Sequence, residues 1–124
     1  IRALASDRIV THGFVPSMDP FLDGCRLSVA PWRYGAGVKG KVNQSMAHGQ
    51  PVVATSIAAE GMNLRHGEDV LVADDAAGFA AQVIRLYGDE ALWNRLAQAG
   101  LVNIEAHFSM AAARRVIAGL VDLP

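Results

Sequence analysis

The sequence predicts a single α/β domain in which a parallel sheet of about four strands is flanked by helices. Short apolar runs typical of strands alternate with segments whose apolar residues recur every three or four positions, as in amphipathic helices. The run at residues 51–55 is apolar throughout, as in a parallel strand covered on both faces. With 124 residues, 52% of them hydrophobic, the chain has room for one core but not for two. We therefore treat residues 1–124 as one domain.

The composition restricts the classes of protein to which the chain can belong. The net charge is −1 and the basic residues are scattered, so no basic stripe could follow a nucleic-acid backbone. No apolar run approaches the roughly 18 to 20 residues that cross a bilayer, and no signal-peptide pattern opens the chain. Cys25 is the only cysteine, and we expect a small buried hydrophobe rather than a nucleophile. These features predict a cytoplasmic protein that binds no nucleic acid.

For the first part of the chain, the sequence predicts two strands and one short helix. Residues 8–11 (RIVT) are rich in β-branched side chains and are predicted to form the first strand. Ser17 is the expected N-cap of a helix over residues 18–24, in which Pro20 occupies an early position. The apolar run at residues 27–30 is the second strand. Because no initiator methionine precedes the first strand, we expect a fragment whose exposed sheet edge favours self-association into a homo-oligomer.

A glycine-rich loop separates the second strand from the next helix. That helix is predicted over residues 39–48, because apolar residues recur at helical spacing and Gly49, followed by Pro51, prevents its continuation. The third strand occupies residues 51–55. One helical turn is expected within the loop of residues 56–62.

A fourth strand and an amphipathic helix come next. The strand spans residues 69–73 and is followed by Asp74 and Asp75, where an N-cap and a first-turn carboxylate stabilise the start of a helix. The buried stripe predicted for this helix consists of Phe79, Val83, Leu86 and Tyr87.

The C-terminal helices are predicted from about residue 89 to residue 122. Asp89 opens the first of them and Ser109 caps the last. The residues expected to face inward are Leu92, Trp93, Leu96, Gly100 and Ile104 in the first, and Ala112, Val116, Ile117 and Leu120 in the last.

The loop and helix after the second strand have the features of an anion site. Glycines in residues 34–38 let the backbone come close to a ligand. The first amides of the helix have no partner inside it and carry the positive end of its dipole. Lys39 and Lys41 add positive charge, although either could be a solvated helix residue. The expected ligand is therefore a phosphate or diphosphate.

Gly35, Gly40 and Lys41 also match the spacing of the phosphate loop of ATPases. The next residue should be Ser or Thr to hold magnesium, but Val42 cannot ligate a metal. Asp74 could imitate the acidic motif of such ATPases, although an Asp at a helix start is more often a cap. A P-loop-like ATPase is therefore the weakest functional interpretation.

Several separated motifs together carry a resemblance to a known family. The run APWRYGAGVKGK at residues 30–41 precedes MAHGQPVVAT at residues 46–55 and EG at residues 60–61. In this order they resemble group 1 glycosyltransferases of the GT-B fold, in particular the C-terminal half of their Rossmann-like nucleotide-sugar-binding domain. The resemblance extends from HGFV at residues 12–15 to HFS at residues 107–109.

The resemblance implies donor-binding positions only where residues match. Those expected at the donor diphosphate are Gly35, Ala36, Gly37, Val38, Lys39 and Lys41. Many members carry two glutamates eight positions apart, but the matching residues here are Ala36 and Gln44. Gln44 can still hydrogen-bond ribose hydroxyls, whereas Ala36 has no side-chain group to offer. Glu60 either contacts the sugar or nucleotide or caps a turn.

The implied reaction transfers a glycosyl group from a nucleoside diphosphate sugar to an acceptor hydroxyl, in glycan, polysaccharide or glycolipid synthesis. The resemblance implies no metal and no cofactor. None of the four histidines has another histidine at the spacing of a metal-binding pair; they are His12, His48, His66 and His107. The acceptor would bind the N-terminal domain of a full-length enzyme with possible peripheral membrane association, so the isolated chain should not catalyse. The alternative interpretation is a non-catalytic α/β nucleotide-binding or interaction module.

Overall fold

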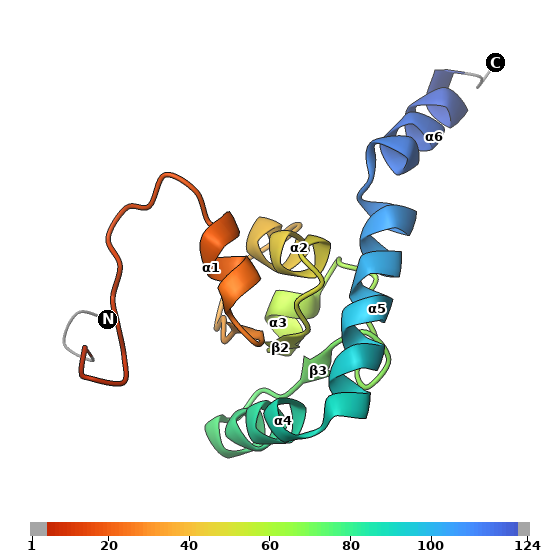
Figure 1. The fold of residues 1–124 in the computed structure, drawn as a ribbon. Coiled ribbons are helices and arrows are strands. Elements are labelled where there is room, and N and C mark those ends of the chain that lie inside the picture. Colours follow the sequence, from red (N-terminus) through yellow and green to blue (C-terminus); the bar gives the residue numbers. More distant parts are fainter. Residues whose placement is uncertain (1–4, 122–124) are drawn as a thin grey trace.

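The computed structural model describes residues 5–121, and its elements follow the predicted α/β alternation. Three short strands form one parallel sheet in the order β1-β2-β3, and helices flank it (Figure 1). The elements are α1 Asp19–Gly24, β1 Ser28–Ala30, α2 Gly40–Ala47, β2 Val52–Ala54, α3 Ser56–Ala59, β3 Leu71–Val72, α4 Ala76–Gly88, α5 Glu90–His107 and α6 Met110–Val121. The predicted α/β fold with a parallel sheet is therefore confirmed.

The central strand, β2, is buried along its whole length because both faces of the sheet are covered. Val52 pairs with Ser28 of β1, and Val53 pairs with Leu71 of β3. Successive side chains of a strand point to opposite faces. Val52 and Ala54 accordingly enter one hydrophobic cluster, whereas Val53 enters another. The sheet thus separates two cores.

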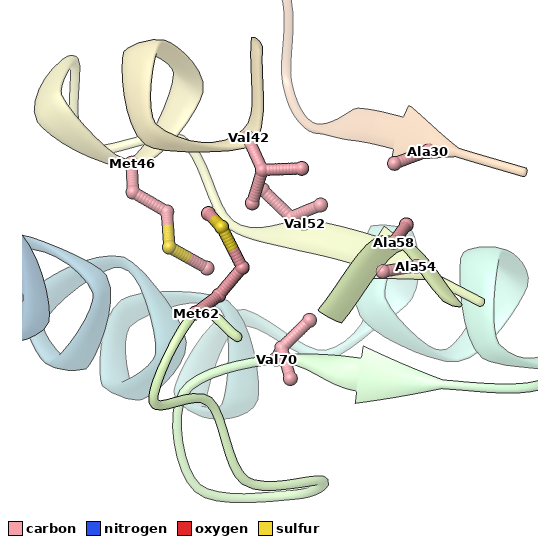
Figure 2. Packing of buried hydrophobic residues seen from close by; sticks show 8 residues of the cluster. All are labelled: Ala30, Val42, Met46, Val52, Ala54, Ala58, Met62 and Val70. Atoms are coloured by element: carbon pink, nitrogen blue, oxygen red, sulfur yellow. The ribbon is translucent and has the colours of Figure 1, made fainter. Parts of the chain in front are cut away.

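The first core lies between the sheet and the helices α2 and α3. Met46 of α2 and Met62 of the loop after α3 both belong to it and are buried (Figure 2). Gly100 of α5 approaches so closely that a Cβ atom there would lie 3.2 Å from the Met46 Cγ atom. The missing side chain at Gly100 lets α5 pack directly on α2. The cluster comprises Ala30, Val42, Met46, Val52, Ala54, Ala58, Met62 and Val70.

The second core lies on the opposite face of the sheet. Val53 and Leu71 enter it from the strands, Leu86 from α4, and Leu92 and Leu96 from α5. The inward positions predicted for α4 and α5 from helical spacing supply most of this core.

The N-caps of the C-terminal helices agree with the sequence pattern, and that of α4 differs by one residue. Asp89 and Ser109 each accept an N–H group of the following helix, at 2.9 Å and 3.1 Å. The N-cap of α4 is Asp75, whose Oδ1 accepts the N–H of Gly78 at 2.8 Å. Asp74, the predicted N-cap, binds Ser56 instead.

The prediction of a strand at residues 8–11 is wrong. Ser6 and Ile9 form an isolated antiparallel bridge, and the Ser6 Oγ atom accepts the N–H groups of Arg8 and Ile9 at 3.3 Å and 3.2 Å. Ile9 and Val10 are 49% and 71% exposed, because no strand in the described residues lies beside them. The segment before α1 extends away from the sheet instead of joining it (Figure 1).

The sequence pattern also overestimates burial at Tyr87, at Cys25 and along α6. Cys25 is exposed, and Tyr87 lies at the surface with the Cζ atom of Arg26 5.0 Å from its ring centroid. In the stripe predicted for α6, Ala112 is buried and the other members are exposed. They are exposed because this helix projects away from the sheet (Figure 1). The exposed members are Val116, Ile117 and Leu120.

The last helix, α6, extends to Val121, the last described residue. The predicted helix end, residue 122, lies outside the described residues. None of the helices in residues 5–121 combines the length and the apolar character needed to span a membrane.

Candidate functional site

The glycine-rich loop leaves the carboxyl end of β1 and ends at the start of α2. Gly35 and Gly37 have φ angles of 143° and 74°, which favour glycine over residues with a Cβ atom. Residues 35–38 are exposed. Loops at the carboxyl ends of parallel strands are the usual place for ligands in α/β sheets. The loop therefore offers an accessible and conformationally unusual stretch of backbone.

No side chain in residues 5–121 caps the start of α2. Lys39 is its N-cap residue, and the first turn contains no acidic residue. The N–H groups of Gly40 and Lys41 have no acceptor among residues 5–121. Unpaired amides at the positive end of a helix dipole attract anions. The α2 start is therefore suited to receive an anion from outside the described chain.

Lys39 is buried, with 1% of its surface exposed. Its N–H donates to the Met62 Sδ atom at 3.2 Å, and its Nζ atom donates to the carbonyl oxygen of Glu60 at 3.3 Å. Within residues 5–121, Lys39 forms no ion pair with a carboxylate. The structure thus brings together two sequence-predicted site residues, Lys39 and Glu60, through a side chain and a backbone carbonyl.

Lys41 and Gln44 line a second feature, a cavity of about 160 Å³ between α1, β1 and α2. Lys41 is exposed and Gln44 is partly buried, and Met18 and Leu22 contribute an apolar wall. Ala36 is not among the lining residues. The cavity therefore joins two of the predicted donor contacts and leaves Ala36 in the exposed loop.

Thr55 fixes the loop to the carboxyl end of β2, a role that the sequence pattern did not reveal. Its N–H donates to the carbonyl of Ala30 at 3.1 Å, and its Oγ1 atom donates to the carbonyl of Trp32 at 2.7 Å. The same Oγ1 atom accepts the N–H of Ala58 at 3.3 Å and so caps α3. The sequence signal for this role is a threonine directly after an apolar strand, since threonine is a preferred N-cap residue.

Asp74 joins the end of β3 to the start of α3. Its carboxylate accepts the N–H of Ser56 at 2.7 Å and the Ser56 hydroxyl at 2.6 Å. The hydroxyl bond first, and then the backbone bond, lower the pKa of Asp74 below its ordinary value of 3.8. Asp74 is therefore a structural anion that holds the start of α3 to the end of β3.

His48, expected from the sequence to sit at a helix end, links α2 to α1. Its Nδ1 atom lies 2.8 Å from Asp23 Oδ1, and its Nε2 atom lies 3.4 Å from Asp19 Oδ1. In the described part of the chain, no group of three His, Cys, Asp or Glu side chains is placed to hold a metal ion. Val42 lies in the first core, so the residue after Lys41 offers a metal no ligand.

Two comparisons with known proteins bear on this site. A family model described as "Glycosyl transferases group 1" matches residues 1–89. An uncharacterized 44.6 kDa protein in the cps region of Klebsiella pneumoniae is 34% identical over 76 residues, which are 61% of this chain and 20% of that protein. The chain thus spans about a fifth of the length of this curated relative.

Proposed function

The chain belongs to the group 1 glycosyl transferases, and from this premise we propose that it binds the diphosphate of a nucleoside diphosphate sugar at the start of α2. The observation that carries the proposal is the uncapped start of α2. Its first amides have no acceptor in the described part of the chain, its first turn contains no acidic residue, and the preceding loop is exposed. A diphosphate would satisfy these amides and complement the helix dipole.

Two lysines supply positive charge in this proposal. Lys41 is exposed on the first turn of α2 and can contact a phosphate directly. Lys39 has a buried ammonium group that forms no ion pair with a carboxylate in residues 5–121. Burying a charge without a counterion is costly, so an arriving anion would gain from Lys39 as well. Gly35, Ala36, Gly37 and Val38 would contribute backbone amides.

In this proposal the ribose of the donor occupies the cavity beside Lys41. Gln44 presents an amide to this cavity, and an amide can both donate to and accept from a sugar hydroxyl. Glu60, bound through its carbonyl to Lys39, would then lie on the side of the transferred sugar.

The chemistry follows from where charge develops. As the sugar departs, negative charge grows on the leaving diphosphate, and preorganised amides and cations stabilise that charge. We propose that Lys39, Lys41 and the α2 amides do this without a metal ion. The acceptor, a glycan or glycolipid, would be bound by other parts of a longer cytoplasmic enzyme. The 20% coverage of the relative supports the greater length of that enzyme.

The test is an amide chemical-shift titration of the chain with UDP, GDP and ADP, each with and without magnesium. We expect shifts centred on residues 35–44 that need no metal, and the tightest nucleotide would name the donor base. Binding that requires magnesium would favour ATPase-like chemistry. No shift with any of the three nucleotides would contradict a donor site in this chain.

A further inference from the structure

The short helix α1 lies beside α2 and is firmly anchored at its C-terminal end (Figure 1). There Leu22 is buried, and the buried amide of Gln50 donates to the carbonyl oxygens of Leu22 and Cys25. Residues 18–20, at the other end of the helix, are exposed. Neither an amide nor a carbonyl titrates near neutral pH, so the anchor at Gln50 is the same at every pH in this range.

The outer face of α1 is held by the imidazole of His48, which lies at the end of α2. Asp19 and Asp23 are four positions apart and therefore share one face of α1. The His48 Nδ1 atom lies 2.8 Å from Asp23 Oδ1, and its Nε2 atom lies 3.4 Å from Asp19 Oδ1. A carboxylate oxygen only accepts, so the ring contacts both residues favourably only when both of its nitrogens carry a proton. In the neutral ring, one nitrogen would turn its lone pair toward a carboxylate.

The other elements that pack on α2 bring no competing charge to His48. These elements are α5, β1 and β2, and the two strands contain no titratable residue. No charged group of α5 forms a hydrogen bond or an ion pair with His48 in residues 5–121. On α2 itself, Lys41 lies two turns earlier. The titratable residues of α5 are Glu90, Arg95, Glu105 and His107.

A second histidine, His12, also contacts α1. Its ring centroid lies 4.7 Å from that of Phe21, in an edge-to-face arrangement. A pH response of α1 could therefore come from either histidine, and an experiment has to separate the two.

Helix α1 forms one wall of the cavity of about 160 Å³ beside Lys41. Met18 and Leu22 line this cavity from the α1 side, and Lys41 and Gln44 line it from α2. Leu22 is fixed by the anchor at the C-terminal end of the helix. Met18 directly precedes Asp19, so the contact of Asp19 with α2 determines where this part of the wall lies.

We propose that His48 is a positioning residue whose protonation closes α1 against α2 and so completes the cavity. Loss of one proton from the ring removes the attraction to Asp19, and the first turn of α1 then moves away about the end held by Gln50. The closed position is therefore favoured at low pH and lost as the pH rises. The effect on ligand binding rests on the proposed function, in which the cavity receives the ribose, whereas the closure itself does not.

The first experiment is an NMR titration of the 124-residue chain without ligand between about pH 5 and about pH 8, the range in which histidine side chains titrate. We expect the amides of residues 18–23 to shift with the same midpoint as the ring nitrogens of His48. Shifts of these amides that follow the ring of His12 instead, or no shifts at all, would overturn the inference.

The second experiment measures the affinity for UDP-glucose over the same pH range. This probe is suitable because its diphosphate is esterified at both ends and keeps its charge throughout the range. We expect the affinity to fall by at least about threefold from the lowest to the highest pH, as when a hydrogen bond is weakened. Binding that does not depend on pH would overturn the inference and leave the donor site standing. Shifts of α1 that follow His48 without any UDP-glucose binding would support the closure and contradict the donor site.

Two variants and one control assign the response to the contact between His48 and Asp19. In Asp19→Asn, the new amide can donate to the unprotonated Nε2 while Nδ1–H donates to Asp23, so the neutral ring keeps both contacts. UDP-glucose should then bind with little dependence on pH. His48→Gln should also remove the pH dependence, and His12→Gln should retain it. An unchanged pH dependence in both Asp19→Asn and His48→Gln would overturn the inference.

Discussion

The Nζ atom of Lys39 lies 3.3 Å from the carbonyl oxygen of Glu60, and this hydrogen bond joins the start of α2 to the end of α3. The backbone of Lys39 is bound to the same segment through the Met62 Sδ atom. The lysine charge is therefore fixed below the surface at the uncapped end of α2. A buried charge is screened less by salt than an exposed one, so Lys39 would attract a ligand anion more strongly from this position than from the surface.

Replacing Lys39 by methionine tests this relationship. Methionine keeps most of the length and the apolar stem of lysine, and removing a buried charge that no carboxylate of residues 5–121 balances offsets the lost hydrogen bond to Glu60. We expect the urea midpoint of Lys39→Met to change little, whereas UDP binding weakens by roughly tenfold, as for loss of one charge-assisted contact. Lys41→Met is the exposed counterpart and should leave stability unchanged. Unaltered UDP binding in Lys39→Met together with clear destabilisation would show that Lys39 is only structural.

Gly37→Ala tests the conformation of the loop. Gly37 has a φ of 74°, where a Cβ atom costs roughly 1–2 kcal/mol. We expect urea denaturation to show a loss of this size, or the loop to rearrange and lose its UDP response. Gly40→Ala is the matched control, because its φ is not positive and its Cβ would meet open space. Equal stability of the two variants together with an unchanged UDP response of Gly37→Ala would contradict the strained loop.

Much of the fold was predictable because it depends on local pattern. The strands at residues 28–30, 52–54 and 71–72 lie within the predicted apolar runs, and Asp89 and Ser109 cap the helices as expected. Residues 8–11 have an equally strong strand pattern. A strand needs a neighbour, however, and sequence pattern cannot show that no strand in the described residues lies beside this segment.

The loop and the helix that frame the candidate site were predictable, but the contacts of their side chains were not. The glycines and Pro51 mark the loop and the limits of α2, since both act through the local backbone. The bond between Lys39 and Glu60 joins residues 21 positions apart, and the charge of Lys39 argues for exposure instead of the observed burial. The bond of Thr55 to Trp32 is likewise a tertiary contact over 23 positions. Such contacts depend on how the elements pack, which periodicity does not specify.

Gly100→Ala tests the contact between α5 and α2. The new Cβ atom would lie 3.2 Å from the Cγ and 3.4 Å from the Cβ of Met46, which is itself packed in the first core. We expect destabilisation of about 1–3 kcal/mol from overpacking, which exceeds the gain in helix propensity. In α6, the new Cβ atom of Gly119→Ala would meet no neighbouring atom of the described residues within 4 Å, and this variant should instead stabilise by up to about 1 kcal/mol. Thermal unfolding of both variants gives the comparison, and a gain in stability at Gly100 would disprove direct packing.

Asp74→Asn tests the ionised link between β3 and α3. Because the Ser56 hydrogen bonds lower the pKa of folded Asp74 below 3.8, its contribution to stability is fully present above that value. The contribution is lost as the pH falls through the lowered folded pKa, where the carboxylate becomes protonated. Asp74→Asn should therefore be less stable than the parent near neutral pH, and the difference should shrink in acid on the low side of pH 3.8. Urea midpoints across this range, with Ser56→Ala to complete a double-mutant cycle, measure the coupling. A pH-independent difference would show that the shape of the side chain matters here and its charge does not.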